Sequence, residues 1–461
     1  MFLSSFLDLY ILQKTSIYLH KKPQYICTKN LNSCYNIAMG KYINRISDAI
    51  LEKYLRAFGG VLIEGVKGCG KTTSAKQIAR SFIEFQDEEK REMYLALAKD
   101  HPSELLKGDR PRLFDEWQDA PTIWGAIRKS IDDEQLIGAY ILTGSSSGKV
   151  KTPHTGTMRI ARMKMYPMSL YESGDSNGSV SLIDLFEGKT PFEGCKSDLS
   201  FEDIKYVVCR GGWPNTLNVK NKKDKLLVAE SLFNQTCEID IHNISSKRRN
   251  ENTTRKILRS YARNICTIAK KKTIYEDSGI SENTFNDYLE DLEKLNIICD
   301  VNAWCPAIRS KEAMRSSPKR NLVDPSIACA ALGIGPDYFI NDYQILGFLF
   351  ESLCIRDLKI YSSLYGGEVS YYHDRYGLEA DAVLHLKDGR FALIEIKLGQ
   401  SEIDEGAKHL TEIESLIKQH NETEKQNKLR LPDLKIVITG TEYGYQREDG
   451  VYVIPLGCLK D

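Results

Sequence analysis

The sequence predicts an α/β protein of several domains, and three stretches carry that prediction. Residues 61–79 have the pattern of a strand, a glycine-rich loop and a helix. Residues 273–304 have the pattern of helix, turn, helix and strand, and residues 343–397 that of a helix followed by a strand hairpin. At 461 residues the chain has room for about three domains, each long enough to bury a core of its own.

The first stretch contains a phosphate-loop motif. Gly65 to Thr72 spell G-x-x-x-x-G-K-T, the Walker A spacing, directly after an apolar strand. Glycines let the backbone curl until its amides face a phosphate, and the following helix presents its positive end to the same anion. Lys71 can then reach the β- and γ-phosphates, while the Thr72 hydroxyl can bind Mg²⁺. We therefore expect ATP and Mg²⁺ as cofactors, with the nucleotide bound by Gly65, Lys67, Gly68, Cys69, Gly70, Lys71, Thr72 and Thr73.

An acidic pair follows the next predicted strand, which starts at residue 112. Asp115 is placed to hold Mg²⁺ through water, and Glu116 to orient or deprotonate the attacking water. The alternative is that the aspartate only caps the helix that follows.

Three further residues are candidates for contact with the γ-phosphate. The strand at residues 140–142 ends in Thr143, whose hydroxyl could sense the phosphate from a neighbouring strand end, unless this is only a Ser/Gly loop. Arg159 and Arg162 follow a glycine-containing turn and could stabilise charge in the transition state. They could act within one chain or from a neighbouring copy in a homo-oligomer, or they could form only a solvated basic face.

Four motifs together resemble one family. GxxxxGKT, FDEWQDAPTIWGAIRKSID, YILTGSS and HTGTxRIARMxMxPMSLYESG are similar to those of bacterial and archaeal AAA-type P-loop ATPases, and the match covers nearly everything from Met39 onward. The chain departs from that pattern at Met158, where the family usually has glycine. The resemblance implies an ATPase with a winged-helix segment and a C-terminal domain related to PD-(D/E)XK nucleases, which have a restriction-endonuclease-like fold.

The expected organisation follows from these motifs and that resemblance. Residues 1–38 show no period and are expected to be a disordered extension or a mis-assigned start. The remaining parts are an AAA-type ATP-binding domain at 39–200, a helical lid or linker at 201–255, a winged-helix domain at 256–335 and a nuclease-like domain at 336–461.

A basic segment precedes the predicted winged helix. Residues 247–272 hold ten Lys or Arg and a single acidic residue, so they could bind the phosphates of DNA. The second helix of the motif could enter a groove, but the face available for this is acidic or amide-rich, with Glu282, Asn283, Asn286 and Asp287. A winged helix that makes only protein contacts is the alternative.

The C-terminal hairpin gathers carboxylates and an amine. If Gly389 is left-handed in a three-residue turn, Asp381 lies opposite Glu395, and Lys397 shares a face with Glu395. Glu351 can approach from the preceding helix. Alone, E-x-K is often a surface ion pair. Two carboxylates and an amine also suit metal-assisted hydrolysis, with Asp381 and Glu395 holding Mg²⁺, Glu351 as a further ligand, and Lys397 activating water or steadying the charged phosphate. This is the D…E-x-K pattern of PD-(D/E)XK nucleases, and the resemblance carries to these positions.

Composition adds limits. Lys+Arg and Asp+Glu both number 63, so net charge indicates no partner. The twelve cysteines form no C-x-x-C pair, which favours reduced thiols in a cytoplasmic protein. No apolar run is long enough to span a membrane. We expect an ATPase whose nucleotide state moves a winged-helix and nuclease-like module. The alternatives are an ATP-gated, metal-dependent nuclease and a non-catalytic ATP-binding interaction protein.

Overall fold

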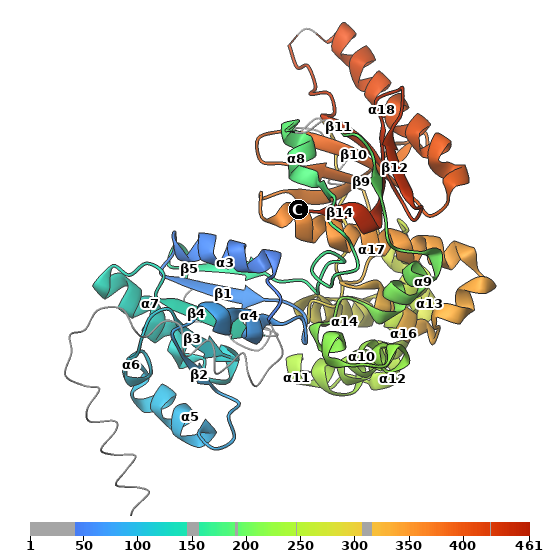
Figure 1. The fold of residues 1–461 in the computed structure, drawn as a ribbon. Coiled ribbons are helices and arrows are strands. Elements are labelled where there is room, and N and C mark those ends of the chain that lie inside the picture. The colour runs from blue at the N-terminus through green and yellow to red at the C-terminus, as the bar shows by residue number, and fades with distance from the viewer. Residues whose placement is uncertain (1–41, 145–155, 190–191, 246, 307–315, 425) are drawn as a thin grey trace, which may run out of the picture. The chain divides into compact units, whose positions relative to one another are not determined.

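The computed structural model describes residues 42–461 apart from 145–155, 190–191, 246, 307–315 and 425 (Figure 1). The extension predicted at residues 1–38 lies outside this described part. Residues 44–461 form one compact unit. Among the described residues, no helix is both long enough and apolar enough to cross a membrane.

A parallel five-stranded sheet in the order β2-β3-β4-β1-β5 occupies the first part of this unit. Its strands are β1 (Gly60–Glu64), β2 (Ser81–Glu84), β3 (Arg112–Asp115), β4 (Tyr140–Gly144) and β5 (Ile160–Lys164). The three strands predicted from apolar runs are confirmed as β1, β3 and β4. These are the inner strands, and almost all of their residues are buried.

The two edge strands, β2 and β5, escape sequence reasoning because an edge strand is only partly buried and needs no apolar run. In β5 only Ile160 and Met163 are buried, and Arg162 and Lys164 are exposed. The acidic segment at residues 84–92 connects a strand to a helix. Glu84 ends β2, and the helix begins only at Arg91.

Helices cover both faces of this sheet. Side chains alternate along β1, so Val61 and Ile63 pack in the core shared with α3 and α4, whereas Leu62 packs on the opposite face with α7. The helices are α3 (Ile46–Leu55), α4 (Lys71–Ile78), α5 (Arg91–Asp100), α6 (Pro102–Leu105), the short η1 (Trp117–Asp119) and α7 (Thr122–Glu134).

The middle of the chain is helical and contains a two-stranded wing. Its helices are α9 (Phe201–Arg210), η2 (Pro214–Asn218), α10 (Lys222–Gln235), the π-helical η3 (Thr236–Asp240), α11 (Ile241–Ile244), α12 (Glu251–Arg263), α13 (Lys271–Ser278), α14 (Glu282–Lys294), α16 (Pro325–Leu332) and η4 (Pro336–Ile340). We call residues 298–303 and 317–322 the wing, because Ile298 pairs with Leu322 and Val301 with Lys319 in antiparallel bridges. The predicted order of helix, turn, helix and strand is therefore present.

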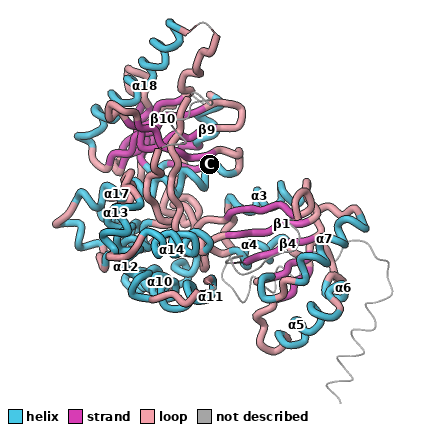
Figure 2. The backbone as a smooth tube through the Cα atoms, turned by 180° about the vertical axis from the view of Figure 1, so that it is seen from behind, coloured by secondary structure: helices cyan, strands magenta, loops and turns pink. Residues whose placement is uncertain are grey.

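A seven-stranded mixed sheet, ordered β7-β12-β13-β11-β10-β9-β8, forms the C-terminal part. Two long helices pack against its strands, and Figure 2 shows the strands between them. Side chains of β10 alternate between the two cores, with Ile394 on the α17 side and Leu393 on the α18 side. The elements are α17 (Tyr343–Ser363), β8 (Glu368–His373), β9 (Glu379–His385), β10 (Phe391–Lys397), η5 (Gln400–Glu402), α18 (Ile403–Thr423), β11 (Leu434–Thr439), β12 (Tyr443–Gln446), β13 (Tyr452–Pro455), η6 (Leu456–Cys458) and β14 (Leu459–Lys460).

The segment after β5 pairs with C-terminal strands in two places, one in the seven-stranded sheet and one in a separate two-stranded sheet. Strand β7 (Cys195–Lys196) pairs with β12, and β6 (Val180–Ser181), which precedes α8 (Leu182–Glu187), pairs with β14. The expected end of the nucleotide domain at residue 200 stays a prediction. Strands β6, β7 and β14 are two residues long, and pairing across more than 240 positions leaves no pattern in a sequence.

Candidate functional site

The predicted phosphate loop joins β1 to α4. Gly68 and Gly70 have φ angles of 79° and 103°, in the left-handed region that glycine enters without strain. A Cβ on Gly65 would clash with the backbone oxygen of Met165. The sequence motif therefore matches the backbone shape that lets successive amides face an anion.

Lys71 lies inside the curve of this loop. Its side chain is buried, and its Nζ donates hydrogen bonds to the carbonyl oxygens of Gly65 (2.9 Å) and Val66 (3.1 Å). These bonds hold the ammonium at the loop, where it can exchange carbonyl partners for phosphate oxygens. Of the other predicted nucleotide-binding residues, Cys69 is buried under the loop and Thr73 lies in the first turn of α4.

Three polar side chains meet beside the loop, where parallel strands end. Thr72 Oγ1 donates a hydrogen bond to Asp115 Oδ1 at 2.6 Å, and Thr143 Oγ1 donates to the same oxygen. Asp115 and Thr143 are register partners at the carboxyl ends of β3 and β4. The hydroxyl of Thr72 and the carboxylate of Asp115 are hard oxygen donors, so this pair fits Mg²⁺.

Glu116 follows Asp115 in a strained conformation. Its φ of 53° and ψ of 49° are left-handed, which is unusual for a residue with a side chain. Gln118 Nε2 donates a hydrogen bond to its carboxylate. Backbone strain of this kind persists where the surroundings enforce it, often at functional sites. The structure therefore places a second carboxylate next to the predicted Mg²⁺ ligand.

Arg159 is not brought to the phosphate loop of its own chain. Its carbonyl accepts from Gly60 N at the start of β1, whereas the loop follows the end of β1. Its side chain pairs with Asp132 at 2.7 Å. Because β5 runs parallel to β1, the residue before β5 must lie at the amino edge of the sheet, and this corrects the idea of action within one chain. Met158 has a φ of 69°, which explains why glycine is usual at that position.

Arg162 lies in the middle of β5, next to Leu62 of β1. Its Nη1 pairs with Glu64 Oε1 at 2.8 Å, and its side chain remains half exposed. Its role at the nucleotide stays a prediction.

Much of the basic segment at residues 247–272 is neutralised. Arg249 is buried and pairs with Asp291 at 2.5 Å. On the predicted groove face, Asp287 pairs with Lys247 and Asn286 accepts a bond from Lys271. The cations with carboxylate partners are Lys247, Arg249, Arg255, Arg263 and Lys272. Half of the ten cations therefore already have anionic partners, which the linear count of charges could not reveal.

The register predicted for the C-terminal hairpin is confirmed. Gly389 has a φ of 89°, and Leu386 N donates to Arg390 O at 2.8 Å. The paired residues continue to Ile394 opposite Ala382, which brings Asp381 and Glu395 next to each other. The adjacent Ile396 N donates to Asp381 Oδ2 at 2.8 Å.

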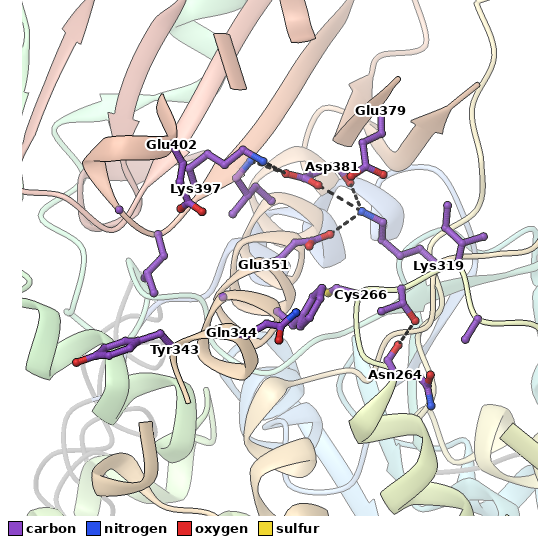
Figure 3. Close-up of a pocket in the computed structure, with 18 of the residues that line it drawn as sticks. Asn264, Cys266, Lys319, Tyr343, Gln344, Glu351, Glu379, Asp381, Lys397 and Glu402 are labelled. Atoms are coloured by element: carbon purple, nitrogen blue, oxygen red, sulfur yellow. Dashed lines mark hydrogen bonds and ion pairs between the residues drawn. The ribbon is translucent and has the colours of Figure 1, made fainter. Parts of the chain in front are cut away.

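The predicted C-terminal residues line or adjoin a cavity of about 1030 Å³ (Figure 3). Lys397 Nζ lies 2.7 Å from Glu395 Oε2 and 3.8 Å from Asp381 Oδ2. Glu395 is fully buried, and His409 Nδ1 lies 3.6 Å from its other oxygen. Burial, together with the nearby Asp381, raises the pKa of Glu395 to about 8, although Lys397 lowers it.

A lysine that sequence reasoning missed enters the same site. Lys319, from the wing, places its Nζ 2.7 Å from Glu351 Oε1 and 3.6 Å from Asp381 Oδ1 (Figure 3). No motif marks Lys319, because the partners lie 32 and 62 positions away.

The expected Mg²⁺ ligands Glu351, Asp381 and Glu395 do not fit a metal ion in this arrangement. Within the described ranges, no group of three or more His, Cys, Asp or Glu could hold one. Each of these carboxylates has a lysine partner instead. The expectation that these three carboxylates hold Mg²⁺ is therefore corrected, because in this arrangement they contact lysines.

A second buried network joins segments that sequence reasoning treated as separate. Arg356 of α17 pairs with Asp324 at 2.8 Å and with Asp357 at 2.7 Å. Asp324 also accepts from Gly212 N, and Asp357 accepts from Leu170 N. We call residues 210–214 the RGGWP turn and residues 167–172 the PMSLYE segment. The PMSLYE segment is thus tied to α17 directly through Asp357, and the RGGWP turn is tied to it through the Asp324–Arg356 pair.

The phosphate loop is tied to that same PMSLYE segment through Arg45. Arg45 Nη1 donates to Cys69 O at 3.0 Å, and Nη2 donates to Tyr166 O at 3.0 Å. Its Nε lies 3.1 Å from Glu172 Oε1. On the other side of the loop, Lys67 pairs with Asp240 of η3 at 3.2 Å.

Three family models match consecutive parts of the chain. Residues 58–173 match an AAA domain, residues 201–338 a domain of unknown function (DUF8612), and residues 346–459 another domain of unknown function (DUF4143). No curated protein matches the chain. The parallel sheet, the phosphate loop and the first match define residues 58–173 as an AAA-type P-loop domain.

Two solved structures are among those similar to the chain. A DNA replication initiation factor is 13% identical with a TM-score of 0.19, over 59% of this chain and 90% of that one. A signal transduction ATPase with numerous domains (STAND) and a tetratricopeptide repeat sensor, from Pyrococcus horikoshii, is 12% identical with a TM-score of 0.21. That match covers 70% of this chain and 49% of the other protein, so the chain spans about half its length. At these TM-scores neither structure supports a conclusion about this chain.

Proposed function

We propose that this protein is a Mg²⁺-dependent ATPase. The observation that carries the proposal is the shared hydrogen bonding of Thr72 and Thr143 to Asp115, directly beside Lys71 and the phosphate loop. A loop that only bound an anion would not need a hydroxyl and a carboxylate arranged as oxygen donors for a divalent cation.

Each residue has a distinct role in this proposal. Bound ATP with Mg²⁺ supplies an activated γ-phosphate for attack by water. Lys71 and the loop amides bind the phosphates, and Thr72 with Asp115 holds the cation. Glu116 orients the water and accepts its proton at the carboxylate. Thr143 positions Asp115 and lies where it can respond to the γ-phosphate.

We further propose that nucleotide binding is communicated to the rest of the unit. The phosphate loop contacts the helical part through the Lys67–Asp240 ion pair and the PMSLYE segment through Arg45. A phosphate on the loop would compete with Asp240 for Lys67, so binding has a direct route to η3. We also propose that residues 256–335 act as a winged helix whose exposed cations bind the phosphates of DNA.

The two alternatives are weaker. An ATP-gated nuclease would need a metal site in the C-terminal domain, and Lys319 occupies the space between its carboxylates. A non-catalytic ATP-binding protein would have no use for a strained carboxylate next to the cation ligand, which is where Glu116 lies. The position of Lys319 fits a C-terminal domain that resembles a nuclease without acting as one.

The direct test of the nucleotide site is a calorimetric titration with ATP and Mg²⁺. Lys71→Ala should abolish binding, because it removes the ammonium held inside the loop. Lys53→Ala, on the exposed face of α3, is the matched control and should bind like the unaltered chain. Equal affinity in Lys71→Ala and the control would overturn the site.

A further inference from the structure

The Nζ of Lys319 lies between Glu351 and Asp381, two of the three carboxylates that were expected to hold a metal. It donates hydrogen bonds to Glu351 Oε1 at 2.7 Å and to the backbone oxygen of Asp381 at 3.4 Å. It also lies 3.6 Å from Asp381 Oδ1, and its side chain is 4% exposed. These oxygens come from α17 and β9, so the ammonium bridges two elements of the C-terminal domain (Figure 3).

The wing is fastened so that Lys319 stays in this position. Lys319 and Val301 exchange backbone hydrogen bonds of 2.8 and 2.9 Å across the wing. The wing then continues the C-terminal sheet at its β8 edge, because Trp304 N donates to Tyr371 O at 2.7 Å and Tyr371 N donates to Asn302 O at 3.0 Å. The Tyr371 hydroxyl donates to Ser317 O at 2.5 Å. Both wing strands are therefore anchored to β8.

Each of the three expected metal ligands already contacts a lysine. Glu351 and Asp381 contact Lys319, and Glu395 contacts Lys397. The buried ammonium of Lys319 lies at the oxygens of Glu351 and Asp381, so a divalent cation bound to the same oxygens would meet a positive charge at close range.

We infer that Lys319 is the resident cation of the C-terminal carboxylate site and that, with the wing seated, the site binds this side chain instead of a divalent metal. The domain then acts as a docking platform for the wing. This inference is independent of the ATPase proposal, because it concerns oxygens of α17 and β9 and not the phosphate loop.

The test is Mn²⁺ binding by the full chain without nucleotide, followed by electron paramagnetic resonance. The unaltered chain should show no site that depends on Asp381. Lys319→Met keeps the length of the side chain and removes its charge, so it should gain about one Mn²⁺ per chain at the freed oxygens. The gain should disappear in Lys319→Met/Asp381→Asn. Lys359→Met makes the same change at a partly buried lysine of α17 that contacts Cys299, so it is the matched control and should gain nothing.

Two results would overturn the inference. One is an Mn²⁺ site in the unaltered chain that is lost in Asp381→Asn. The other is a folded Lys319→Met chain that gains no site, because the lysine would then not be what excludes the metal.

A second measurement covers the case in which Lys319→Met does not fold. The unaltered chain is treated with Fe²⁺, ascorbate and peroxide, which cleave the backbone wherever the iron is bound. The inference is supported if strands β9 and β10 stay intact and if a folded Lys319→Arg variant resists cleavage equally. Such a result would mean that the carboxylates require a cation on residue 319. Cleavage near Asp381 or Glu395 in the unaltered chain would overturn it.

Discussion

Arg356 and Asp324 form an ion pair of 2.8 Å in which the two side chains are 1% and 0% exposed. Removing one partner of such a pair leaves the other charge buried without compensation, which typically costs about 3–5 kcal/mol. Asp357 would lose the same partner. Because Asp324 and Asp357 also hold the backbone of Gly212 and Leu170, this pair connects three distant segments.

The first prediction concerns this pair. Arg356→Leu should lower the free energy of unfolding by about 3–5 kcal/mol, measured by urea unfolding followed by tryptophan fluorescence. Lys294→Ala breaks an exposed pair with Glu290 and should change it by less than about 0.5 kcal/mol. Equal effects in the two variants would show that the buried network does not hold the segments together.

The second prediction concerns the RGGWP turn. A Cβ on Gly212 would clash with the backbone oxygen of Met168, so Gly212→Ala should destabilise by about 1–3 kcal/mol or more. A Cβ on Gly335 would meet open space, and its φ of −117° suits any residue. Gly335→Ala should therefore be neutral or slightly stabilising. The measurement is the thermal unfolding temperature of both variants. A Gly212→Ala chain as stable as the unaltered chain would contradict the packing of this turn against Met168.

The third prediction concerns Arg159. Its position at the amino edge of the sheet excludes action on its own chain's nucleotide, so any catalytic role requires a neighbouring copy. Arg159→Ala should then slow ATP hydrolysis by up to about 10³-fold, and mixing it with inactive Lys71→Ala chains should restore part of the rate. Lys129→Ala, an exposed cation of α7, is the control. Failure of the mixture to recover would mean that Arg159 serves only its ion pair with Asp132.

The fourth prediction concerns nucleic acid. If the exposed cations of α12 contact phosphates, Lys256→Glu and Arg259→Glu should each weaken DNA binding to all sequences alike. Each should also reduce the slope of log affinity against log salt by about 0.9. Arg255 pairs with Glu251 and Glu238, so Arg255→Gln should have a smaller effect. Fluorescence anisotropy over a salt series measures this. A flat salt response would leave α12 as a surface for protein contacts.

Local patterns predicted much of this fold and site. The phosphate loop, the strand ends at Asp115 and Thr143, and the hairpin that pairs Asp381 with Glu395 all follow from short-range rules of spacing and alternation. These features depend on the residues next to them in the chain, so a single sequence contains the necessary information.

Long-range placement could not be predicted in the same way. Lys319 meets Glu351 only because the wing pairs with β8, and Arg159 is separated from the phosphate loop only because β5 joins the edge of the sheet beside β1. Neither pairing leaves a periodic signal at the residue concerned. The basic segment shows the same limit, since its carboxylate partners come from other helices.

The central claim is that Glu116 is the base of an ATPase, and one measurement tests it most directly. Single-turnover hydrolysis of bound ATP should slow by about 10²–10⁴-fold in Glu116→Gln, while the calorimetric affinity for ATP stays near that of the unaltered chain, because Lys71, Thr72 and Asp115 remain. Glu134→Gln, at the exposed end of α7, should hydrolyse at the normal rate. An unchanged rate in Glu116→Gln, with ATP still bound, would contradict the account.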